Sequence, residues 1–207
     1  YINVALPQDI YPVVALRHIT PVYFPYSSTQ SSAVLSSASL GVSAIAFGSG
    51  AMRNPDKDRI MSIIMDSSSP LVLDADALGL LDLKALAQRS APTIITPHTG
   101  EFSRLTGLSI DETEKDRVRA ALDFSESFGA ITVLKGPGTV VASPDGRYYV
   151  NQTGSQALAQ AGSGDVLTGI SAAMLLFVED PFAAACDAVF FHGLIADEGL
   201  KEHSMQC

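Results

Sequence analysis

Four short apolar runs constrain the fold of this chain more than any other feature. Each run is followed by glycines or polar residues, and helix-like stretches separate the runs along the chain. The runs VSAIAF, PLVLD, TIIT and ITVLK occupy residues 42–47, 70–74, 93–96 and 131–135. Continuous apolar runs of this length are typical of parallel strands that are buried on both faces. The sequence therefore predicts an α/β fold with a largely parallel sheet covered by helices on both sides.

The flanking stretches extend this pattern. Residues 1–6 and 21–26 are predicted strands, although two prolines limit how the second strand can pair. The serine-rich stretch 27–39 is expected to be a loop and a short helix inside the domain. Asp111 is the expected N-cap of a long helix, and Gly129 is its expected end. Predicted helices occupy residues 9–18, 54–65, 77–89, 111–129, 164–178 and 181–199, and a predicted hairpin pairs 139–142 with 147–150.

Charge and cysteine content argue against several classes of protein. The 207 residues carry a net charge of −9, which argues against nonspecific binding to nucleic acid. Cys186 and Cys207 are the two cysteines, so neither a disulfide framework nor a CxxC metal site is expected, and a reducing cytoplasm fits best. Because no apolar run is long enough to span a bilayer, no membrane helix is expected. The opening YINVAL resembles the middle of a fold, so an N-terminal piece is expected to lie outside this chain.

A glycine-rich turn precedes the first of the two C-terminal helices. Gly162 and Gly164 permit backbone angles that are closed to other residues, and they let a ligand approach the amides. If Asp165 lies in the first turn of the helix, free N–H groups and the helix dipole favour a phosphate beside it. A carboxylate there suits a general base acting on a hydroxyl that attacks phosphorus. A plain glycine-rich turn would have the same sequence, and for this motif alone that alternative stays open.

The first two apolar runs end in residues that could face a ligand. Ligands bind beyond the carboxyl ends of parallel strands, so these positions are candidates for a site. Gly48 and Gly50 form either a plain turn or a turn that admits a ligand. Asp74 and Asp76 either orient a ligand or cap the next helix, and capping is the favoured interpretation.

The last two runs end in further candidates. His98 could donate a hydrogen bond and Glu101 could act on a metal or a water, or the pair is a loop histidine followed by a glutamate that starts a helix. Residues 135–139, KGPGT, suit a nucleotide phosphate or ribose, or they simply open a hairpin. No GxxxxGK motif followed by Ser or Thr is present, which excludes a Walker-type site. His192 lies in the apolar stretch AVFFHGLIA and is interpreted as a helix-packing histidine.

Taken together, three motifs resemble the ADP/ATP-dependent NAD(P)H-hydrate dehydratases of the ribokinase-like superfamily. They are ITPHTGE (95–101), KGPGT (135–139) and NQTG…AGSGDVLTG (151–169), with LVLDADAL (71–78) and FFHGLIAD (190–197) in support. The resemblance covers essentially the whole chain and implies one domain over residues 1–207 with three α/β/α layers. It also implies a repair reaction. ADP or ATP, with Mg²⁺, phosphorylates the ring hydroxyl of hydrated NADH or NADPH, and elimination of phosphate restores the dihydropyridine.

The resemblance also implies roles for individual residues. Asp165 would be the base that activates the substrate hydroxyl, and Glu101 would act through magnesium. The transferring phosphate would lie on the turn formed by Gly162, Ser163 and Gly164. The adenine nucleotide would contact Lys135, Gly136, Pro137, Gly138 and Thr139. The hydrated cofactor would contact Gly50, His98 and Asp165.

The chain departs from the family pattern in three places. The family motif TGNPG is replaced by Thr153-Gly154-Ser155-Gln156-Ala157. The family turn GPGLG is replaced by Gly48-Ser49-Gly50-Ala51-Met52, which lacks the last glycine. The family's first strand, its Gly-Gly turn and the helix after it are not visible, so the chain is expected to lack an N-terminal strand and helix and part of the substrate site.

Two other functions stay open at this point. One is a small-molecule kinase of the same superfamily, acting on a vitamin precursor or a sugar. The other is a nucleotide-binding regulator without catalysis. The expected partners are hydrated NADH or NADPH and an adenine nucleotide, with a homo-oligomer and a fused or separate epimerase for the hydrated cofactor. Neither nucleic acid nor a membrane is expected as a partner.

Overall fold

A six-stranded sheet forms the centre of the protein. The structure is a computed structural model that describes residues 1–27, 30–38 and 41–204. The strand order is β3-β4-β5-β6-β7-β8, with parallel pairing from β3 to β6 and antiparallel pairing from β6 to β8. The strands are β3 (Ile45–Phe47), β4 (Leu71–Leu73), β5 (Thr93–Ile95), β6 (Ile131–Leu134), β7 (Val140–Ala142) and β8 (Tyr148–Val150). All four apolar runs are therefore neighbouring parallel strands, as predicted.

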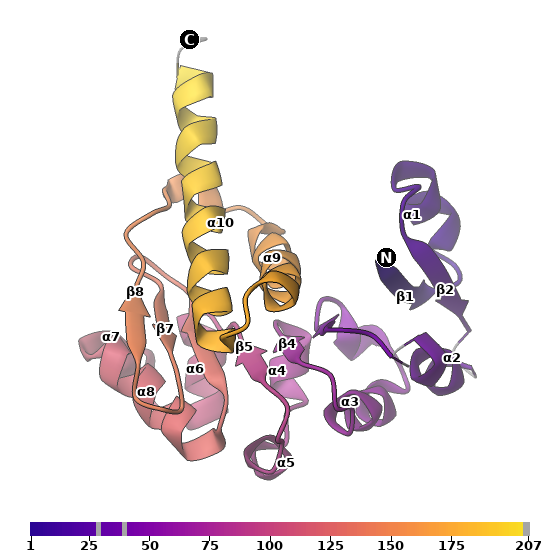
Figure 1. Cartoon of the computed structure of the whole chain (residues 1–207), viewed down its shortest axis with the longest axis horizontal. Helices are drawn as coiled ribbons and strands as arrows, with labels where there is room; N and C mark the ends of the chain where they lie inside the picture. The colour runs from indigo at the N-terminus through magenta and orange to yellow at the C-terminus, as the bar shows by residue number, and fades with distance from the viewer. Residues whose placement is uncertain (28–29, 39–40, 205–207) are drawn as a thin grey trace.

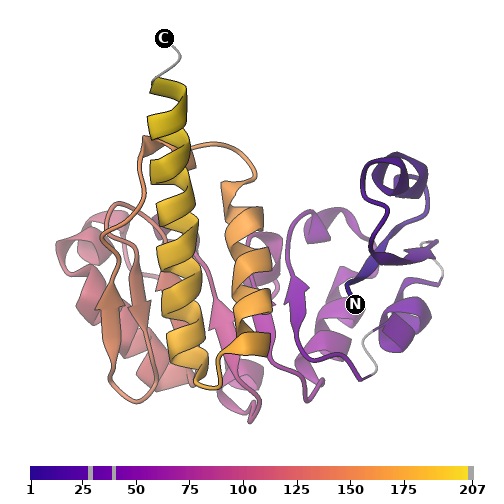
Figure 2. The same ribbon diagram turned by 45° about the horizontal axis from the view of Figure 1, so that its top comes forward.

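Alternate residues of the strands face two separate apolar clusters. In β4, Leu71 and Leu73 belong to one cluster, whereas Val72 belongs to the other. The second cluster is closed by α9 (Ser163–Phe177) and α10 (Pro181–Ser204), which lie side by side on one face of the sheet (Figure 2). The opposite side carries α3 (Lys57–Met65), α4 (Asp76–Gly79), α5 (Leu83–Ala87), α6 (Thr99–Thr106), α7 (Ile110–Lys115) and α8 (Arg117–Phe128). The predicted three-layer arrangement is confirmed.

The first strands form a small sheet of their own. β1 (Asn3–Pro7) and β2 (Val22–Tyr26) pair in parallel, and α1 (Tyr11–Arg17) connects them. Figure 1 shows this unit at the end of the molecule next to α2 (Ser31–Ala38). Among the described residues, neither strand joins the six-stranded sheet, and β2, which contains Pro25, has one partner. Part of the predicted loop and helix at 27–39 lies outside the described residues.

Two predicted long helices are each divided in two. The stretch 77–89 contains α4 and α5, because the chain turns after Gly79 and Asp82 starts α5 by accepting the N–H of Lys84 at 2.9 Å. The stretch 111–129 contains α7 and α8, because Asp116 leaves helical geometry with φ −150°.

The predicted N-cap at Asp111 is therefore wrong, and the predicted end is confirmed. Ser109 caps α7 instead, in a reciprocal capping box with Glu112. The helix therefore begins two residues earlier than predicted, because the Ser109 hydroxyl caps it. Gly129 ends α8 with the left-handed φ of 68° that glycine tolerates.

The last helix runs well past the rest of the domain. Pro181 occupies the first turn of α10, and the Asp180 carboxylate accepts the N–H of Phe182 at 3.2 Å. The C-terminal half of α10, drawn in yellow in Figure 1, extends beyond the body of the molecule. Despite the 24 residues of α10, no helix in the described part of the chain combines the length and hydropathy needed to cross a bilayer.

Candidate active site at the carboxyl edge of the sheet

The candidate residues from four strands and one helix meet at a single edge of the sheet. The Ser49 hydroxyl, after β3, hydrogen-bonds the Asp165 carboxylate in the first turn of α9. His98, after β5, forms a parallel bridge with Lys135, after β6. Lys135 in turn contacts Asp74, which follows β4. The predicted gathering of strand ends is therefore confirmed.

The turn after β3 is fixed by a contact between two backbones. A Cβ atom on Gly48 would lie 1.8 Å from the carbonyl oxygen of Asp74, so no other residue fits there. The Asp74 N–H donates to the carbonyl of Phe47 at 3.1 Å and holds the two strand ends together. Gly50 has a left-handed φ of 73°, and a Cβ atom at Gly50 would meet nothing within 4 Å. Gly48 is therefore required by packing, whereas Gly50 faces open space that a ligand could fill.

The glycine-rich turn presents free backbone amides beside Asp165. Gly162 is the N-cap of α9, with φ 91°, and it supplies no side-chain hydrogen bond to the first turn. Ser163 does not cap the helix either, because its hydroxyl donates to the carbonyl of Leu158 at 2.6 Å. Asp165 lies in this first turn, as predicted. Uncapped amides at the positive end of a helix form an anion site, and Asp165 is adjacent to it.

Gly164 lies directly over a buried ion pair. A Cβ atom at Gly164 would be 3.3 Å from Nζ of Lys135 and 3.4 Å from Oδ2 of Asp74. Nζ of Lys135 lies 2.7 Å from Oδ1 of Asp74, and the same oxygen accepts the Thr96 hydroxyl at 2.7 Å. The favoured interpretation of Asp74 as a helix cap is therefore wrong. Its carboxylate, buried where three strands end, is satisfied by a cation and a hydroxyl.

Asp76 does not cap a helix either. α4 has Ala75 as its N-cap, with φ 50° and no side-chain hydrogen bond. The Asp76 carboxylate instead accepts the N–H of Met52 at 3.0 Å, which ties the turn after β3 to the turn after β4. Both aspartates of the LDADAL stretch therefore connect neighbouring strand ends.

His98 and Glu101 start α6 as a reciprocal capping box. Nδ1 of His98 accepts the N–H groups of Gly100 and Glu101 at 3.0 and 3.2 Å, and the Glu101 carboxylate accepts the N–H of His98 at 2.9 Å. An accepting Nδ1 in a neutral imidazole places the hydrogen on Nε2. Nε2 of His98 lies 3.4 Å from Oε1 of Glu101, and the His98 side chain is 56% exposed, so a ligand in solvent could compete with that carboxylate for the Nε2–H. The alternative of a loop histidine before a glutamate that starts a helix is confirmed as local structure, in which Nε2 also faces Glu101.

The KGPGT turn rests on Arg117, which sequence reasoning missed. A Cβ atom at Gly136 would lie 2.8 Å from the Arg117 guanidinium, and that guanidinium donates to the carbonyl of Leu134 at 2.9 Å. The Thr139 hydroxyl closes the turn by donating to the carbonyl of Gly136 at 3.0 Å. Arg117 is the first residue of α8, 18 positions before Lys135, and no local signal connects it to this turn.

The loop that leads into the glycine-rich turn is held by α10. The Thr153 hydroxyl donates to the carbonyl of Phe190 at 2.9 Å, and the N–H of Gly154 donates to Asp197 at 2.9 Å. A Cβ atom at Gly193 would lie 2.2 Å from the Thr153 hydroxyl oxygen, so helix and loop touch directly. The side chain of His192 bonds the backbone of Ser163, and burial lowers the pKa of His192. The prediction of a packing histidine is confirmed, and its partner is the glycine-rich turn.

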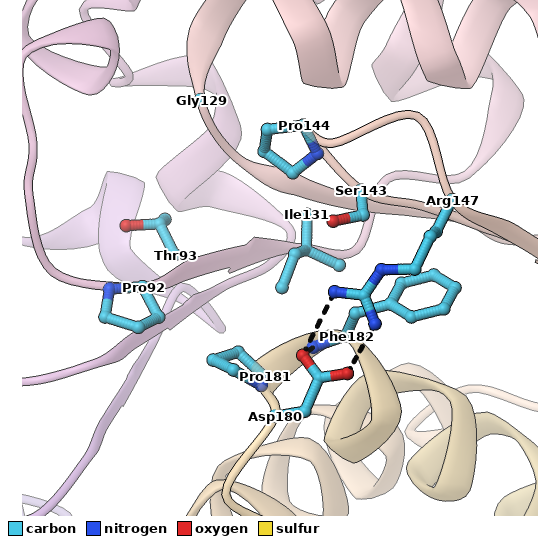
Figure 3. A pocket seen from close by; sticks show the side chains of 10 residues that line it. All are labelled: Pro92, Thr93, Gly129, Ile131, Ser143, Pro144, Arg147, Asp180, Pro181 and Phe182. Atoms are coloured by element: carbon cyan, nitrogen blue, oxygen red, sulfur yellow. Dashed lines mark hydrogen bonds and ion pairs between the residues drawn. The ribbon is translucent and has the colours of Figure 1, made fainter.

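A pocket of about 180 Å³ lies where β5 and β6 begin, at the opposite ends of the strands from these residues (Figure 3). Its guanidinium, from Arg147, donates to Asp180 at 2.6 Å and to Asp145 at 2.8 Å, and it stacks on Phe182. The hydrogen bond from Arg147 lowers the pKa of Asp145 to about 2. The charges of Arg147, Asp145 and Asp180 are therefore paired with one another.

The carboxylates of the candidate site suit a metal held mainly by phosphate. Within the described ranges, no three His, Cys, Asp or Glu side chains are grouped to hold a metal ion. Mg²⁺ commonly takes one or two carboxylates, several waters and substrate phosphates. Glu101, 3.9 Å from Nζ of Lys135, provides one such carboxylate next to the anion site. The donor set therefore fits Mg²⁺ that arrives with a nucleotide.

Known sequences place this chain in a family. Residues 3–207 match the family described as NAD(P)H-hydrate dehydratase. An ADP-dependent (S)-NAD(P)H-hydrate dehydratase from Bacillus subtilis (strain 168) is 39% identical over 161 residues, which is 78% of this chain. The chain covers 57% of that relative's length.

Solved structures agree with the sequence match. The crystal structure of an ADP/ATP-dependent NAD(P)H-hydrate dehydratase from Bacillus subtilis, co-crystallised with ATP/Mg²⁺, has a TM-score of 0.83 at 32% identity, covering 97% of this chain and 70% of that one. A ribokinase-like superfamily protein from Enterococcus faecalis has a TM-score of 0.83 at 22% identity, over 96% and 69% of the two chains, which identifies the fold. With its ribokinase-like fold, the chain belongs to the NAD(P)H-hydrate dehydratase family.

Proposed function

We propose that this chain catalyses the nucleotide-dependent dehydration of hydrated NADH or NADPH, as a lyase that repairs the cofactor. The observation that carries the proposal is Asp165 in the first turn of α9, beside amides that no side chain caps. Asp165 supplies a base and the amides supply a phosphate site, which are the two requirements for transfer of a phosphoryl group to a hydroxyl. The activities for which the two Bacillus subtilis proteins are named support the same reaction.

The proposed reaction proceeds in two steps. Asp165 accepts the proton of the ring hydroxyl while the hydroxyl oxygen attacks the terminal phosphorus of ADP or ATP. The bond between that phosphorus and the rest of the nucleotide breaks, and AMP or ADP leaves. The ring C–O bond then breaks, phosphate leaves with the electron pair of that bond, and the neighbouring ring carbon loses a proton to solvent water. The new C=C bond restores the dihydropyridine. Mg²⁺, when bound, would neutralise phosphate charge.

The positions of the side chains support a division of the candidate site into two parts. The turn at 162–164 would hold the transferring phosphate, and 135–139 would hold the nucleotide. Because Lys135 points toward Gly164, we assign its cation to the phosphate end of that nucleotide. Nε2–H of His98 and the open space at Gly50 would receive the hydrated cofactor, and Glu101 would face Mg²⁺.

Recovery of absorbance at 340 nm from hydrated NADH and hydrated NADPH, with ADP and ATP supplied in turn, tests the proposal. The wild-type protein should restore the absorbance, and Asp165→Asn should lower turnover by about 10²–10⁴-fold, the usual contribution of a general base. Nucleotide affinity measured by calorimetry should persist in the variant because the amides are unchanged. A turnover rate of Asp165→Asn within about threefold of wild type would contradict the assignment of Asp165 as the base.

The same assay separates the rival functions. A small-molecule kinase would give a stable phosphorylated product without recovery of absorbance, and a regulator would bind ADP without turnover. We further propose a homo-oligomer that works in the cytoplasm beside a fused or separate epimerase. The low cysteine content supports the cytoplasm, and the family resemblance supports the homo-oligomer and the epimerase. Light scattering on the purified chain checks the oligomer.

A further inference from the structure

The side chain of Ser49 contacts Asp165, the proposed base, although the two residues are far apart in the sequence. Its hydroxyl donates a hydrogen bond to Oδ1 of Asp165, across 116 positions of sequence. Ser49 lies in the turn between β3 and the short 3-10 helix Ala51–Arg53, and this turn brings its hydroxyl beside Asp165.

The turn that carries Ser49 is fixed on both sides. Gly48 has its backbone against the Asp74 carbonyl, where a Cβ atom would come within 1.8 Å. The N–H of Ala51 donates to the carbonyl of Gly48 at 3.1 Å, and the N–H of Met52 donates to Asp76 at 3.0 Å. Ser49 is thus presented to α9 by a rigid turn, so its hydroxyl can define the orientation of a partner.

The two oxygens of Asp165 have different surroundings. Oδ1 accepts the Ser49 hydroxyl, whereas Oδ2 accepts no hydrogen bond from the described part of the chain. Asp165 is exposed, so without Ser49 its carboxylate could rotate through a broad range of angles. The hydrogen bond selects one orientation and leaves Oδ2 as the free acceptor.

We propose that Ser49 is a positioning residue that holds Oδ1 of Asp165 so that Oδ2 receives the proton of the substrate hydroxyl. This inference rests on the proposed function. Ser49 keeps its own proton throughout, and the substrate proton moves to Oδ2, so the hydrogen bond to Oδ1 persists in both states of the carboxyl group. The role belongs to the proton-transfer step, and nucleotide binding is independent of it.

Steady-state kinetics with hydrated NADH and the preferred nucleotide test this role. Ser49→Ala should lower kcat by about 10- to 150-fold, the effect of losing one hydrogen bond to a charged group, with KM for the nucleotide unchanged. Ser49→Thr keeps the hydroxyl and should recover a rate within about threefold of wild type. If Ser49 only held the turn in place, kcat would not fall in Ser49→Ala and recover in Ser49→Thr while KM stayed constant.

Ser69→Ala is the matched control. The Ser69 hydroxyl donates to the carbonyl of Val42 at 2.8 Å. This hydrogen bond joins the chain just before β4 to the chain just before β3, at the ends of these strands that lie away from Ser49. This variant should keep wild-type kcat, and circular dichroism should show all three variants folded. If wild type is active and Ser49→Ala is equally active, the Ser49 assignment alone is wrong. If wild type is inactive with both nucleotides, the proposed function and the assignment that rests on it are both wrong.

Discussion

Nζ of Lys135 lies 2.7 Å from Oδ1 of Asp74, and this ion pair lies directly beneath Gly164. The Asp74 side chain is 3% exposed and the Lys135 side chain is 21% exposed. The cation faces the glycine-rich turn, because a Cβ atom at Gly164 would lie 3.3 Å from Nζ of Lys135. A hairpin entry would not require a cation in this position. Asp74 therefore fixes the position of the Lys135 ammonium beside the glycine-rich turn before a ligand arrives.

Lys135→Ala should weaken nucleotide binding and leave KM for hydrated NADH nearly unchanged. Loss of a charge-assisted hydrogen bond to phosphate should cost about 1.5–3 kcal/mol of binding free energy. Calorimetric titration with ADP and ATP measures this loss. Lys115→Ala, which removes an exposed lysine at the end of α7, is the control and should bind as wild type. An unchanged nucleotide Kd in Lys135→Ala would contradict the assignment.

His98→Ala should show the reverse pattern, with a raised KM or lower kcat for the hydrate and an unchanged nucleotide Kd. Loss of the Nε2–H donor accounts for about 1.5–3 kcal/mol if the ligand group is charged. Because Nδ1 also caps α6, the alanine variant should lose about 0.5–2 kcal/mol of stability.

His98→Asn separates these two effects. Asparagine is a good N-cap, so the melting temperature should recover while the hydrate kinetics remain impaired. If both His98 variants weakened only nucleotide binding, the proposed division of the candidate site would be wrong.

Gly164→Val should weaken nucleotide binding sharply. Its Cβ would lie 3.3 Å from Nζ of Lys135, and the branched side chain would cover the amides of the first turn. Gly169→Ala is the matched control on the same helix, because a Cβ there meets no atom within 4 Å. The control should bind nucleotide normally and gain about 0.5–1 kcal/mol of stability. Equal affinity of Gly164→Val and wild type by calorimetry would remove this turn from the phosphate site.

His192 should make the fold less stable in mild acid. Burial lowers the pKa of His192 in the folded protein below the unfolded value of 6.5. Above pH 6.5 the histidine is neutral in both states. As the pH falls below 6.5, the unfolded state gains the proton first, so stability decreases until the lowered folded pKa is reached.

His192→Gln lacks this titration, so the difference in melting temperature between pH 7.5 and pH 5.5 should be smaller in the variant than in wild type. Thermal melts at the two pH values measure the difference. An identical decrease in both proteins would show that His192 does not contribute to the acid sensitivity.

Most of the fold was predictable because burial determines the sequence of these strands. Leu71, Val72 and Leu73 are buried on both faces, and such strands appear as unbroken apolar runs. Helix ends were less predictable, because Ser109 and Asp111 are both plausible caps and Asp116 interrupts a pattern that otherwise looks continuous. Local signals of similar strength compete there, and packing decides between them.

The site was predictable mainly where a residue type and a strand end coincide. His98 and Lys135 satisfy that condition, Asp165 was predictable from the glycine-rich turn that starts a helix, and the structure brings all three to one edge. Arg117 supports the KGPGT turn from the start of another helix, and Ser49 meets Asp165 across 116 positions. Contacts of this kind depend on the folded topology, and no short stretch of sequence contains them.

The order of the sheet has a consequence for how the site forms during synthesis. From β3 to β8, each strand pairs with the one that precedes it along the chain, so pairing can follow the order in which the strands emerge. α9 emerges after all six strands of this sheet and must return to β3 and β4, where Asp165 meets Ser49 and Gly164 lies over the pair of Asp74 with Lys135 from β6. A nascent chain that stops before α9 can hold assembled strand ends but lacks Asp165, the proposed base. Asp165 therefore meets Ser49 only when α9 docks on the sheet.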